Sequence, residues 1–158
     1  MSRPITVAVV GRRRDPPARD LALAEEVGCS IAHAGWVTVT GGRGGIMDAA
    51  QRGAHDAGGI VVAITPMDME AVGPATVVIR SGLPAVARNI VTASSCDAMV
   101  VVPGSHGTWQ ETTIALERRI PVVAVGDHPV LFPGVEEVLS WQLSAVLQAR
   151  LAPHSSTV

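Results

Sequence analysis

Aromatic residues and an excess of charge are what this sequence most clearly lacks. Only 3% of its 158 residues are aromatic, with no Tyr and one Phe, so a surface that stacks on nucleic-acid bases is not expected. The 12 basic and 14 acidic side chains nearly cancel and leave a formal charge of −2. This balance argues against broad, charge-driven binding of nucleic acid. We therefore expect no nucleic-acid partner.

Long hydrophobic runs are missing as well, although 47% of the residues are hydrophobic. The apolar stretches are short, as in 59–64 and 98–102, and none approaches the ~18 residues that a membrane span needs. The first residues include no long apolar region followed by a small-residue cleavage site, so no signal peptide is predicted. We expect a cytoplasmic protein that does not associate with membranes.

Cysteine and clustered histidine are too scarce to form a recognisable metal site. Cys29 and Cys96 are the two cysteines, and they stand far apart in the sequence with no ligand spacing such as CxxC. The five histidines form no HExxH motif or paired cluster. We interpret the cysteines as small, buried thiols. The sequence predicts no metal and no cofactor.

What the sequence does contain is a regular alternation of strand-like and helix-like segments. Its length fits one domain, which we place at 1–152, with a flexible tail at 153–158. Short β-rich runs predict strands at 5–10, 36–40, 60–64, 76–79, 97–102 and 121–125. Apolar stripes at steps of three and four predict helices at 18–34, 46–57, 84–95, 108–119 and 135–151. The residues predicted to face inward on the helix at 84–95 are Ala87, Ile90, Val91 and Ser94.

Strands that are apolar on both faces and separated by helices are typical of a parallel sheet with helices on both sides. Because strand–helix crossovers are almost always right-handed, we predict an α/β fold with a doubly wound, Rossmann-like parallel sheet. Such folds bind ligands at the carboxyl ends of the strands, where the strand order reverses. The unusual residues of this sequence concentrate at those ends.

The first unusual segment is a glycine loop between a predicted strand and a predicted helix. Its residues are Gly41, Gly42, Arg43, Gly44 and Gly45. Without Cβ atoms the backbone can approach a ligand closely, and the helix that follows presents free N–H groups, which favour a phosphate. Arg43 could add a bidentate contact. The alternative is a tight turn that only lets the helix pack, with Arg43 in solvent.

A second loop of the same kind follows a later predicted strand. Its residues are Gly104, Ser105, His106, Gly107 and Thr108. Flexible backbone, free N–H groups and two hydroxyls again suit a phosphate. His106 could contact a ligand or lie at the surface. Glu111, three residues beyond Thr108, could belong either to a ligand site or to a capping box that closes the helix end.

Arginines supply the remaining candidate residues. Arg88 stands at the flank of the apolar face of its helix, from which it could either extend into solvent or point to the crevice between the loops. Arg12, Arg13 and Arg14 follow the first strand at the same edge of the sheet. This run could be solvated or could attract an anionic ligand.

The two loops together resemble those of a known superfamily. Segments 41–50 and 103–111 are similar to the paired signatures of the Rossmann-like LOG-type proteins, whose members have often been labelled "lysine decarboxylase-like". In the second signature, PGGxGTxxE, the residues that match are Gly107, Thr108 and Glu111. The resemblance extends over most of the chain.

The resemblance implies an activity and roles for individual residues. LOG enzymes cleave the N-glycosidic bond of cytokinin nucleoside 5′-monophosphates and release ribose 5-phosphate. By this resemblance Arg88 and Glu111 correspond to the catalytic arginine and glutamate, and the two glycine loops hold the phosphate. A carboxylate can stabilise an oxocarbenium-like transition state, and a guanidinium can hold a phosphate or a sugar hydroxyl. No metal or redox cofactor is needed.

The sequence departs from the LOG pattern in two places and also resembles a compact branch of the superfamily. Ser105 replaces the second glycine of the signature, and Arg88 follows Ala-Val-Ala, whereas LOG enzymes carry Arg-Lys after Met-His. In its short length and its Arg88-Asn89 pair, the chain resembles the branch that includes the molybdenum cofactor carrier proteins, which bind a phosphorylated pterin.

These observations support two main hypotheses. The first is a binding or carrier protein for a small phosphorylated, nucleotide-like ligand, either a nucleoside monophosphate or a phosphorylated pterin. The second is a nucleoside 5′-monophosphate phosphoribohydrolase, an enzyme that hydrolyses the N-glycosidic bond. A third hypothesis, an interaction scaffold that binds no small ligand, does not explain why the two glycine loops are clustered. The resemblance also implies a homodimer or a higher homo-oligomer.

Overall fold

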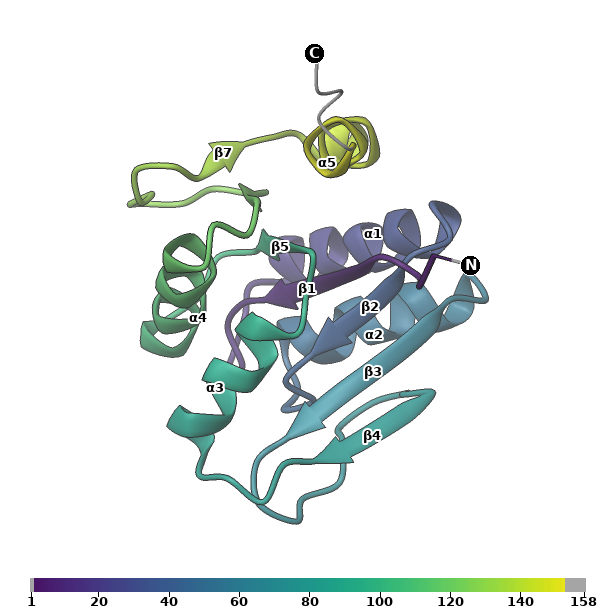
Figure 1. The fold of residues 1–158 in the computed structure, drawn as a ribbon, viewed down its shortest axis with the longest axis vertical. Coiled ribbons are helices and arrows are strands. Elements are labelled where there is room, and N and C mark those ends of the chain that lie inside the picture. The colour runs from purple at the N-terminus through teal and green to yellow at the C-terminus, as the bar shows by residue number, and fades with distance from the viewer. Residues whose placement is uncertain (1, 153–158) are drawn as a thin grey trace.

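The structure of the chain, a computed structural model, describes residues 2–152 and is built around one β-sheet (Figure 1). The elements in chain order are β1 (Thr6–Val10), α1 (Ala18–His33), β2 (Val37–Thr40), α2 (Ile46–Asp56), β3 (Ile60–Thr65), β4 (Val77–Arg80), α3 (Ala85–Ser94), β5 (Ala98–Val101), α4 (His106–Glu117), β6 (Val122–Ala124), β7 (Glu136–Glu137), the 3₁₀ helix η1 (Ser140–Gln142) and α5 (Leu143–Leu151). The strands β1 to β6 are rich in β-branched residues, which fit a pleated backbone. The predicted tail at 153–158 lies outside the described residues.

The sheet has the strand order β4-β3-β2-β1-β5-β6-β7, and every neighbouring pair is parallel. The predicted α/β fold with a doubly wound, Rossmann-like sheet is therefore confirmed. From β1 the chain moves outward through β2, β3 and β4, and then returns to the other side of β1 as β5. The strand order thus reverses between β1 and β5, at the place where such folds bind ligands.

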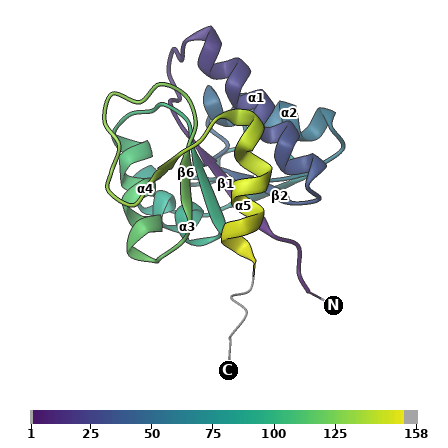
Figure 2. The same ribbon diagram turned by 90° about the horizontal axis from the view of Figure 1, so that it is seen from above.

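Two helical layers cover the sheet (Figure 2). On one face α1, α2 and α5 pack over Val7, Val9 and Val100. On the other face α3 and α4 place Ala93 and Ala115 against the opposite sides of the same strands. These two apolar clusters are buried and hold the carboxyl ends of the central strands in place.

Two glycines bring the backbones of α1 and α2 into contact. A Cβ atom at Gly28 would lie 2.0 Å from the carbonyl oxygen of Ala50, and a Cβ atom at Gly53 would lie 2.0 Å from that of Glu25. Any larger residue would force the two helices apart. The small residues that the sequence places on α2 therefore serve its packing against α1 as well as over the sheet.

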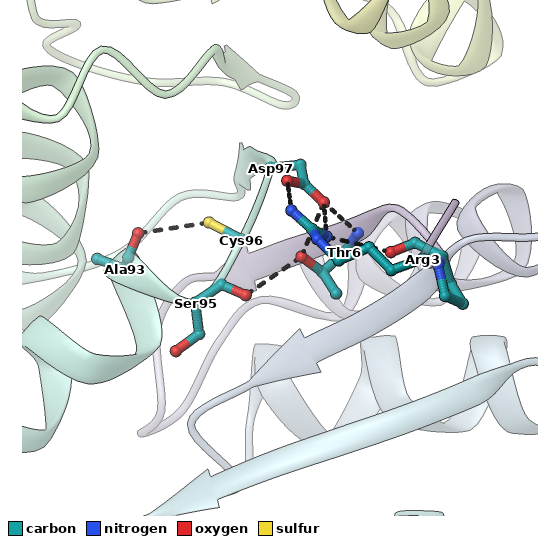
Figure 3. A network of polar contacts seen from close by, with 7 residues as sticks. Arg3, Thr6, Ala93, Ser95, Cys96 and Asp97 are labelled. Atoms are coloured by element: carbon teal, nitrogen blue, oxygen red, sulfur yellow. Dashed lines mark hydrogen bonds and ion pairs between the residues drawn. The ribbon is translucent and has the colours of Figure 1, made fainter. Parts of the chain in front are cut away.

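A polar network ties the beginnings of β1 and β5 together (Figure 3). Asp97 accepts hydrogen bonds from the backbone N–H of Thr6 at 2.9 Å and from its hydroxyl at 3.1 Å. Arg3 donates to the same carboxylate through Nη1 at 2.7 Å. The hydrogen bond from Arg3 is the main reason that the pKa of Asp97 falls to about 2, with the Thr6 bonds acting in the same direction.

Replacing this carboxylate is expected to lower stability in a pH-dependent way. Because its pKa is depressed in the folded state, Asp97 stabilises the fold above pH ~4, and this contribution is lost as the pH falls through 2. Asp97→Asn should lower the free energy of unfolding by about 1 kcal/mol at pH 7. Urea unfolding of both proteins at pH 7 and pH 2.5 measures the difference, which should shrink at the lower pH. Equal stabilities at pH 7 would show that the network contributes nothing.

The predicted strands and helices are confirmed to within two residues at each end, except in the last quarter of the chain. There the sequence predicts one helix over 135–151. Instead, β7 adds a seventh strand beside β6, η1 follows, and α5 begins only at Leu143. β7 consists of Glu136 and Glu137, whose side chains carry no apolar signal for a strand. The backbone pairs with β6 because that edge of the sheet is open.

α3 turns a different face to the core from the one that the sequence predicts. Its buried residues are Arg88, Thr92 and Ala93, whereas Ile90, which was expected to face inward, is 52% exposed. The other residues predicted inward, which are only partly buried, are Ala87, Val91 and Ser94. A charged side chain occupies the inner face because it reaches a pocket at the edge of the sheet.

Candidate functional site

A pocket of about 240 Å³ lies beyond the carboxyl ends of β1, β2 and β5, next to the point where the strand order reverses. It is lined by Gly11, Arg13, Arg43, Met47, Ala85, Arg88, Asn89, Ser105, Gly107, Thr108 and Glu111. Two larger grooves, of about 660 and 650 Å³, lie beside Trp141. The charged side chains that line those grooves are exposed, whereas the smaller pocket contains two buried ones. The pocket at the strand ends is therefore the better candidate for a specific site.

Arg88 forms the buried, positively charged part of this pocket. Only 5% of the residue is exposed, and Nη1 donates a hydrogen bond to the carbonyl oxygen of Ile64 at 3.0 Å. Its buried Nε has no hydrogen-bond partner among the described residues. Burial lowers the pKa of the guanidinium, while the charge of Glu111 works in the opposite direction. An unpaired N–H of a buried guanidinium is costly, and an anionic ligand would satisfy it.

Glu111 brings a buried carboxyl group to the same pocket. The residue is 7% exposed, and burial raises its pKa to about 7, although the charge of Arg88 opposes the shift. The alternative role of Glu111 as a helix cap does not apply. α4 begins at His106 with Ser105 as its N-cap, and the backbone N–H of Ser105 donates to the hydroxyl of Thr108 at 3.3 Å, so Thr108 takes the role in the capping box that the sequence pattern offered to Glu111.

Residues of the second glycine loop take different places. Ser105, Gly107 and Thr108 line the pocket at the beginning of α4, where the first N–H groups of a helix have no acceptor within the helix. Gly104 lies outside the lining, and a Cβ atom there would be 2.0 Å from the Thr108 hydroxyl. His106 also lies outside it, with its ring edge-on to that of Trp109.

The first glycine loop contributes Arg43 to the lining, while its glycines serve packing. A Cβ atom at Gly41 would lie 1.8 Å from Nη1 of Arg88, and one at Gly45 would lie 2.4 Å from the carbonyl oxygen of Arg12. Gly42, Gly44 and Gly45 have positive φ angles. The Cβ-free backbone thus makes room for neighbouring protein groups, among them the guanidinium of Arg88 itself.

One N–H group that the first loop was predicted to offer to a phosphate is taken by the protein itself. The backbone N–H of Ile46, the first residue of α2, donates to the carbonyl oxygen of Arg12 at 2.9 Å, because the turn after β1 passes close to Gly45. Met47, the next residue of α2, lines the pocket. Three residues at the beginning of α4, Ser105, Gly107 and Thr108, line it as well.

Two arginines of the run after β1 differ in their relation to the pocket. Arg13 and Arg14 are both exposed, but Arg13 lines the pocket and Arg14 lies outside the lining. Sequence reasoning missed four lining residues, which are Gly11, Met47, Ala85 and Asn89. Of these four, only Asn89 could have been found from the sequence, because it follows Arg88 in the Arg-Asn pair that resembles the compact branch. Its Nδ2 donates to Oε1 of Gln110 at 2.8 Å, which links α3 to α4.

The charges of the pocket suit a small anion. Three guanidinium groups, from Arg13, Arg43 and Arg88, surround one carboxyl group, so the lining carries a net positive charge whether or not Glu111 is ionised. Arg43 also reaches Met69, with Nη1 3.0 Å from the thioether sulfur, and this contact holds it at the mouth. Arginine forks match the oxygen geometry of phosphate.

Two further properties concern the whole of the described chain. Within residues 2–152, no group of three or more His, Cys, Asp or Glu side chains is arranged to hold a metal ion. Over the same residues, no helix combines the length and the apolar character needed to cross a bilayer. Both cysteines are free thiols; Cys96 is buried and Cys29 is partly buried.

Comparison with known proteins places the chain in a family. An uncharacterized protein of Archaeoglobus fulgidus is 35% identical over 130 residues, which cover 78% of this chain and 85% of the archaeal protein. The structure of the molybdenum cofactor binding protein of Rippkaea orientalis matches with a TM-score of 0.88 at 25% identity, over 96% of this chain and all of the other. The molybdenum cofactor carrier protein of Chlamydomonas reinhardtii matches with a TM-score of 0.87 at 30% identity and the same coverage.

These matches confirm the resemblance to the LOG-like superfamily and to its compact, carrier-protein branch. The family model described as the SLOG cluster4 family matches residues 4–150, nearly the whole chain. The chain therefore belongs to the SLOG cluster4 family.

Proposed function

We propose that this protein binds a small phosphorylated, nucleotide-like ligand in the pocket between the two glycine loops and acts as its carrier. The observation that carries the proposal is Arg88. A buried guanidinium with an unpaired Nε, in a pocket that two further arginines line, is costly unless a bound anion completes its hydrogen bonds. Neither nucleic acid nor a membrane is part of the proposal, and we place the protein in the cytoplasm.

Within this proposal the residues have distinct roles. Arg88 binds the phosphate at the buried end of the pocket, and Arg43 and Arg13 bind it at the pocket mouth. The backbone N–H groups beside Ser105 and Gly107 donate hydrogen bonds to the remaining phosphate oxygens. The pocket of about 240 Å³ takes the phosphate end, and the remainder of the ligand extends past Arg43. Two structural relatives are a molybdenum cofactor binding protein and a molybdenum cofactor carrier protein. Together with the resemblance of the sequence to the carrier branch, this favours a phosphorylated pterin, and a nucleoside monophosphate presents the same kind of phosphate group.

The direct test is a binding experiment with two ligand classes. A panel of nucleoside 5′-monophosphates and a phosphorylated pterin are titrated into the protein by calorimetry and by thermal unfolding. A ligand at ~100 times its Kd should stabilise the fold by roughly 2.7 kcal/mol. If neither class binds or raises the melting temperature, the proposal fails.

Arg43→Ala tests the phosphate end of the site. The side chain is partly buried at the mouth of the pocket, so its loss should weaken binding of the same ligand about tenfold, because one charge-assisted hydrogen bond disappears. The matched control is Arg80→Ala, since Arg80 is exposed and pairs with Glu70 away from the pocket. Unchanged affinity in Arg43→Ala would make Arg43 a bystander.

A second function, hydrolysis of the N-glycosidic bond of a nucleoside 5′-monophosphate, is favoured by one observation. The pKa of Glu111 near 7 suits a group that takes up and gives back a proton at neutral pH. In this reaction a water oxygen bonds to the anomeric carbon as the bond from that carbon to the base nitrogen breaks. The water proton passes to Glu111 and then to the departing base, which leaves ribose 5-phosphate.

Release of free base distinguishes the two functions. Each nucleoside monophosphate is incubated with the protein, and the free base is separated and quantified. Turnover that disappears in Glu111→Gln would establish the hydrolase. Tight binding without base release would establish the carrier.

We also propose that the protein forms a homodimer or a higher homo-oligomer.

A further inference from the structure

The pocket at the strand ends has room for only one end of a nucleotide-like ligand. Its volume of about 240 Å³ is below the roughly 300–1,000 Å³ of sites that enclose a whole drug-sized ligand. Three arginines and one glutamate belong to its lining, which suits a phosphate better than an uncharged ring. A ring joined to that phosphate therefore has to lie outside the pocket, beyond Arg43.

The connection between β3 and β4, residues 66–76, passes next to Arg43. Nη1 of Arg43 lies 3.0 Å from the sulfur of Met69. The backbone N–H of Val72 donates to the carbonyl oxygen of Gly42 in the first glycine loop at 2.9 Å. Met69 and Val72 thus stand beside a residue of the pocket mouth without belonging to the lining of the pocket itself.

Buried polar side chains fix the backbone of this connection. Gln51, which is fully buried, donates from Nε2 to the carbonyl oxygens of Val72 at 2.9 Å and Pro74 at 3.0 Å. The hydroxyl of Thr65, which is also buried, donates to the carbonyl oxygen of Met69 at 2.6 Å. A binding surface needs side chains whose supporting backbone is held in place, and both residues meet this condition.

The side chains that the fixed backbone presents are apolar and open to solvent. Met69 is 41% exposed and Val72 is 47% exposed. Small-molecule sites are lined mostly by apolar groups, with a few polar groups that fix the orientation of the ligand. The charged pocket supplies the polar groups, and Met69 and Val72 supply apolar surface next to it. The thioether of a methionine also makes favourable contacts with aromatic rings.

We propose that the planar ring of the ligand lies on Met69 and Val72 while its phosphate is bound in the pocket. This inference rests on the proposed function and names the class of ligand that the site selects. That class is a phosphate joined to an uncharged heteroaromatic ring, a nucleobase or a pterin, in preference to a sugar phosphate. Burial of one face of the ring against the two side chains provides the preference.

Two pairs of probes test the preference for a ring. Guanosine 5′-monophosphate and ribose 5-phosphate share phosphate and sugar and differ by the ring, and a phosphorylated pterin is compared with inorganic phosphate. Calorimetric titration of the full chain should give a Kd about tenfold lower for the ring-bearing probe in at least one pair, because apolar surface is buried. Equal affinities within both pairs would overturn the inference and leave anion binding intact. Binding of none of these probes would overturn the proposed function as well.

Met69→Ser and Val72→Ser locate the ring surface. Each should weaken binding of the preferred ring-bearing probe about fivefold, because apolar contact is lost, while the Kd of the ring-free probe stays the same. Val77→Ser is the matched control, since Val77 is also 47% exposed but stands at the beginning of β4, away from the carboxyl ends of the strands. An equal loss for both probes, or the same loss in the control, would overturn the assignment.

Met69→Leu separates contact with the ring from contact with Arg43. Leucine keeps an apolar side chain of similar size but removes the sulfur that lies near Arg43. The variant should therefore bind the ring-bearing probe as the unaltered chain does. If Met69 acts only by holding Arg43, Met69→Leu and Met69→Ser should both weaken binding of ribose 5-phosphate. That result would overturn the direct contact with the ring.

Discussion

Gly41→Ala is expected to abolish anion binding although position 41 does not line the pocket. The added Cβ atom would lie 1.8 Å from Nη1 and 2.8 Å from Cζ of Arg88, far inside van der Waals contact. The guanidinium is held by its hydrogen bond to the Ile64 carbonyl, so it has to leave its place. Loss of a buried charge-assisted contact typically costs 2–5 kcal/mol, and we expect ligand affinity to fall at least 30-fold, as it should in Arg88→Ala.

A double-mutant cycle separates this effect from a general disturbance of the glycine loop. Gly41→Ala alone should destabilise the fold by about 1–3 kcal/mol, as overpacking does. In the Arg88→Ala background the clash is gone, so the same change should cost much less. Gly107→Ala is the stability control, because its Cβ atom would meet Asn89 at an ordinary 3.7 Å. Equal costs in both backgrounds would contradict the role assigned to Gly41.

The sequence predicts this fold well because each strand is a short apolar run that ends at a glycine or a polar loop. The strands through β6 and the helices through α4 are confirmed to within two residues. The segment from β6 to α5 is predicted poorly for a physical reason. The two glutamates of β7 pair through backbone alone, and backbone pairing at an open edge leaves no mark in the side-chain pattern.

The candidate site is predicted in part. Arg88 and Glu111 follow from the resemblance, and the structure brings both into one pocket with Arg43, Ser105 and Thr108. What a single sequence cannot distinguish is a glycine that approaches a ligand from one that approaches another part of the protein. Gly45 faces carbonyl oxygens of the turn after β1, and the spacing of the loop would be the same in either case.

The orientation of α3 shows where pattern reasoning fails. An apolar stripe is assumed to face the core and an arginine to face solvent. In α3 the arginine is inside, where it lines the pocket and donates to the carbonyl oxygen of Ile64, and Ile90 is outside. The same inversion places a guanidinium in the pocket and leaves the apolar side of the helix exposed.

The carboxyl group of Glu111 should make stability fall as the pH rises from 4.5 to about 7, and anion affinity fall as the pH rises through 7. Its pKa rises from 4.5 to about 7 on folding because of burial. The stabilisation that accompanies this raised pKa is fully present below pH 4.5 and is lost as the pH rises to about 7, to an extent of about 3 kcal/mol. Asp97 titrates below pH ~4, outside this window.

Glu111→Gln isolates this contribution, because the amide keeps the shape of the side chain and does not titrate. From pH 4.5 to pH 8 the variant should gain about 3 kcal/mol in unfolding free energy relative to the unaltered chain, as measured by urea titration. Sulfate, whose charge is constant over this range, should bind the unaltered chain several-fold more tightly at pH 6 than at pH 8, because neutral Glu111 leaves the charge of Arg88 uncompensated. In Glu111→Gln the sulfate affinity should not change with pH. An equal pH dependence in the two proteins would mean that Glu111 does not govern the charge of the pocket.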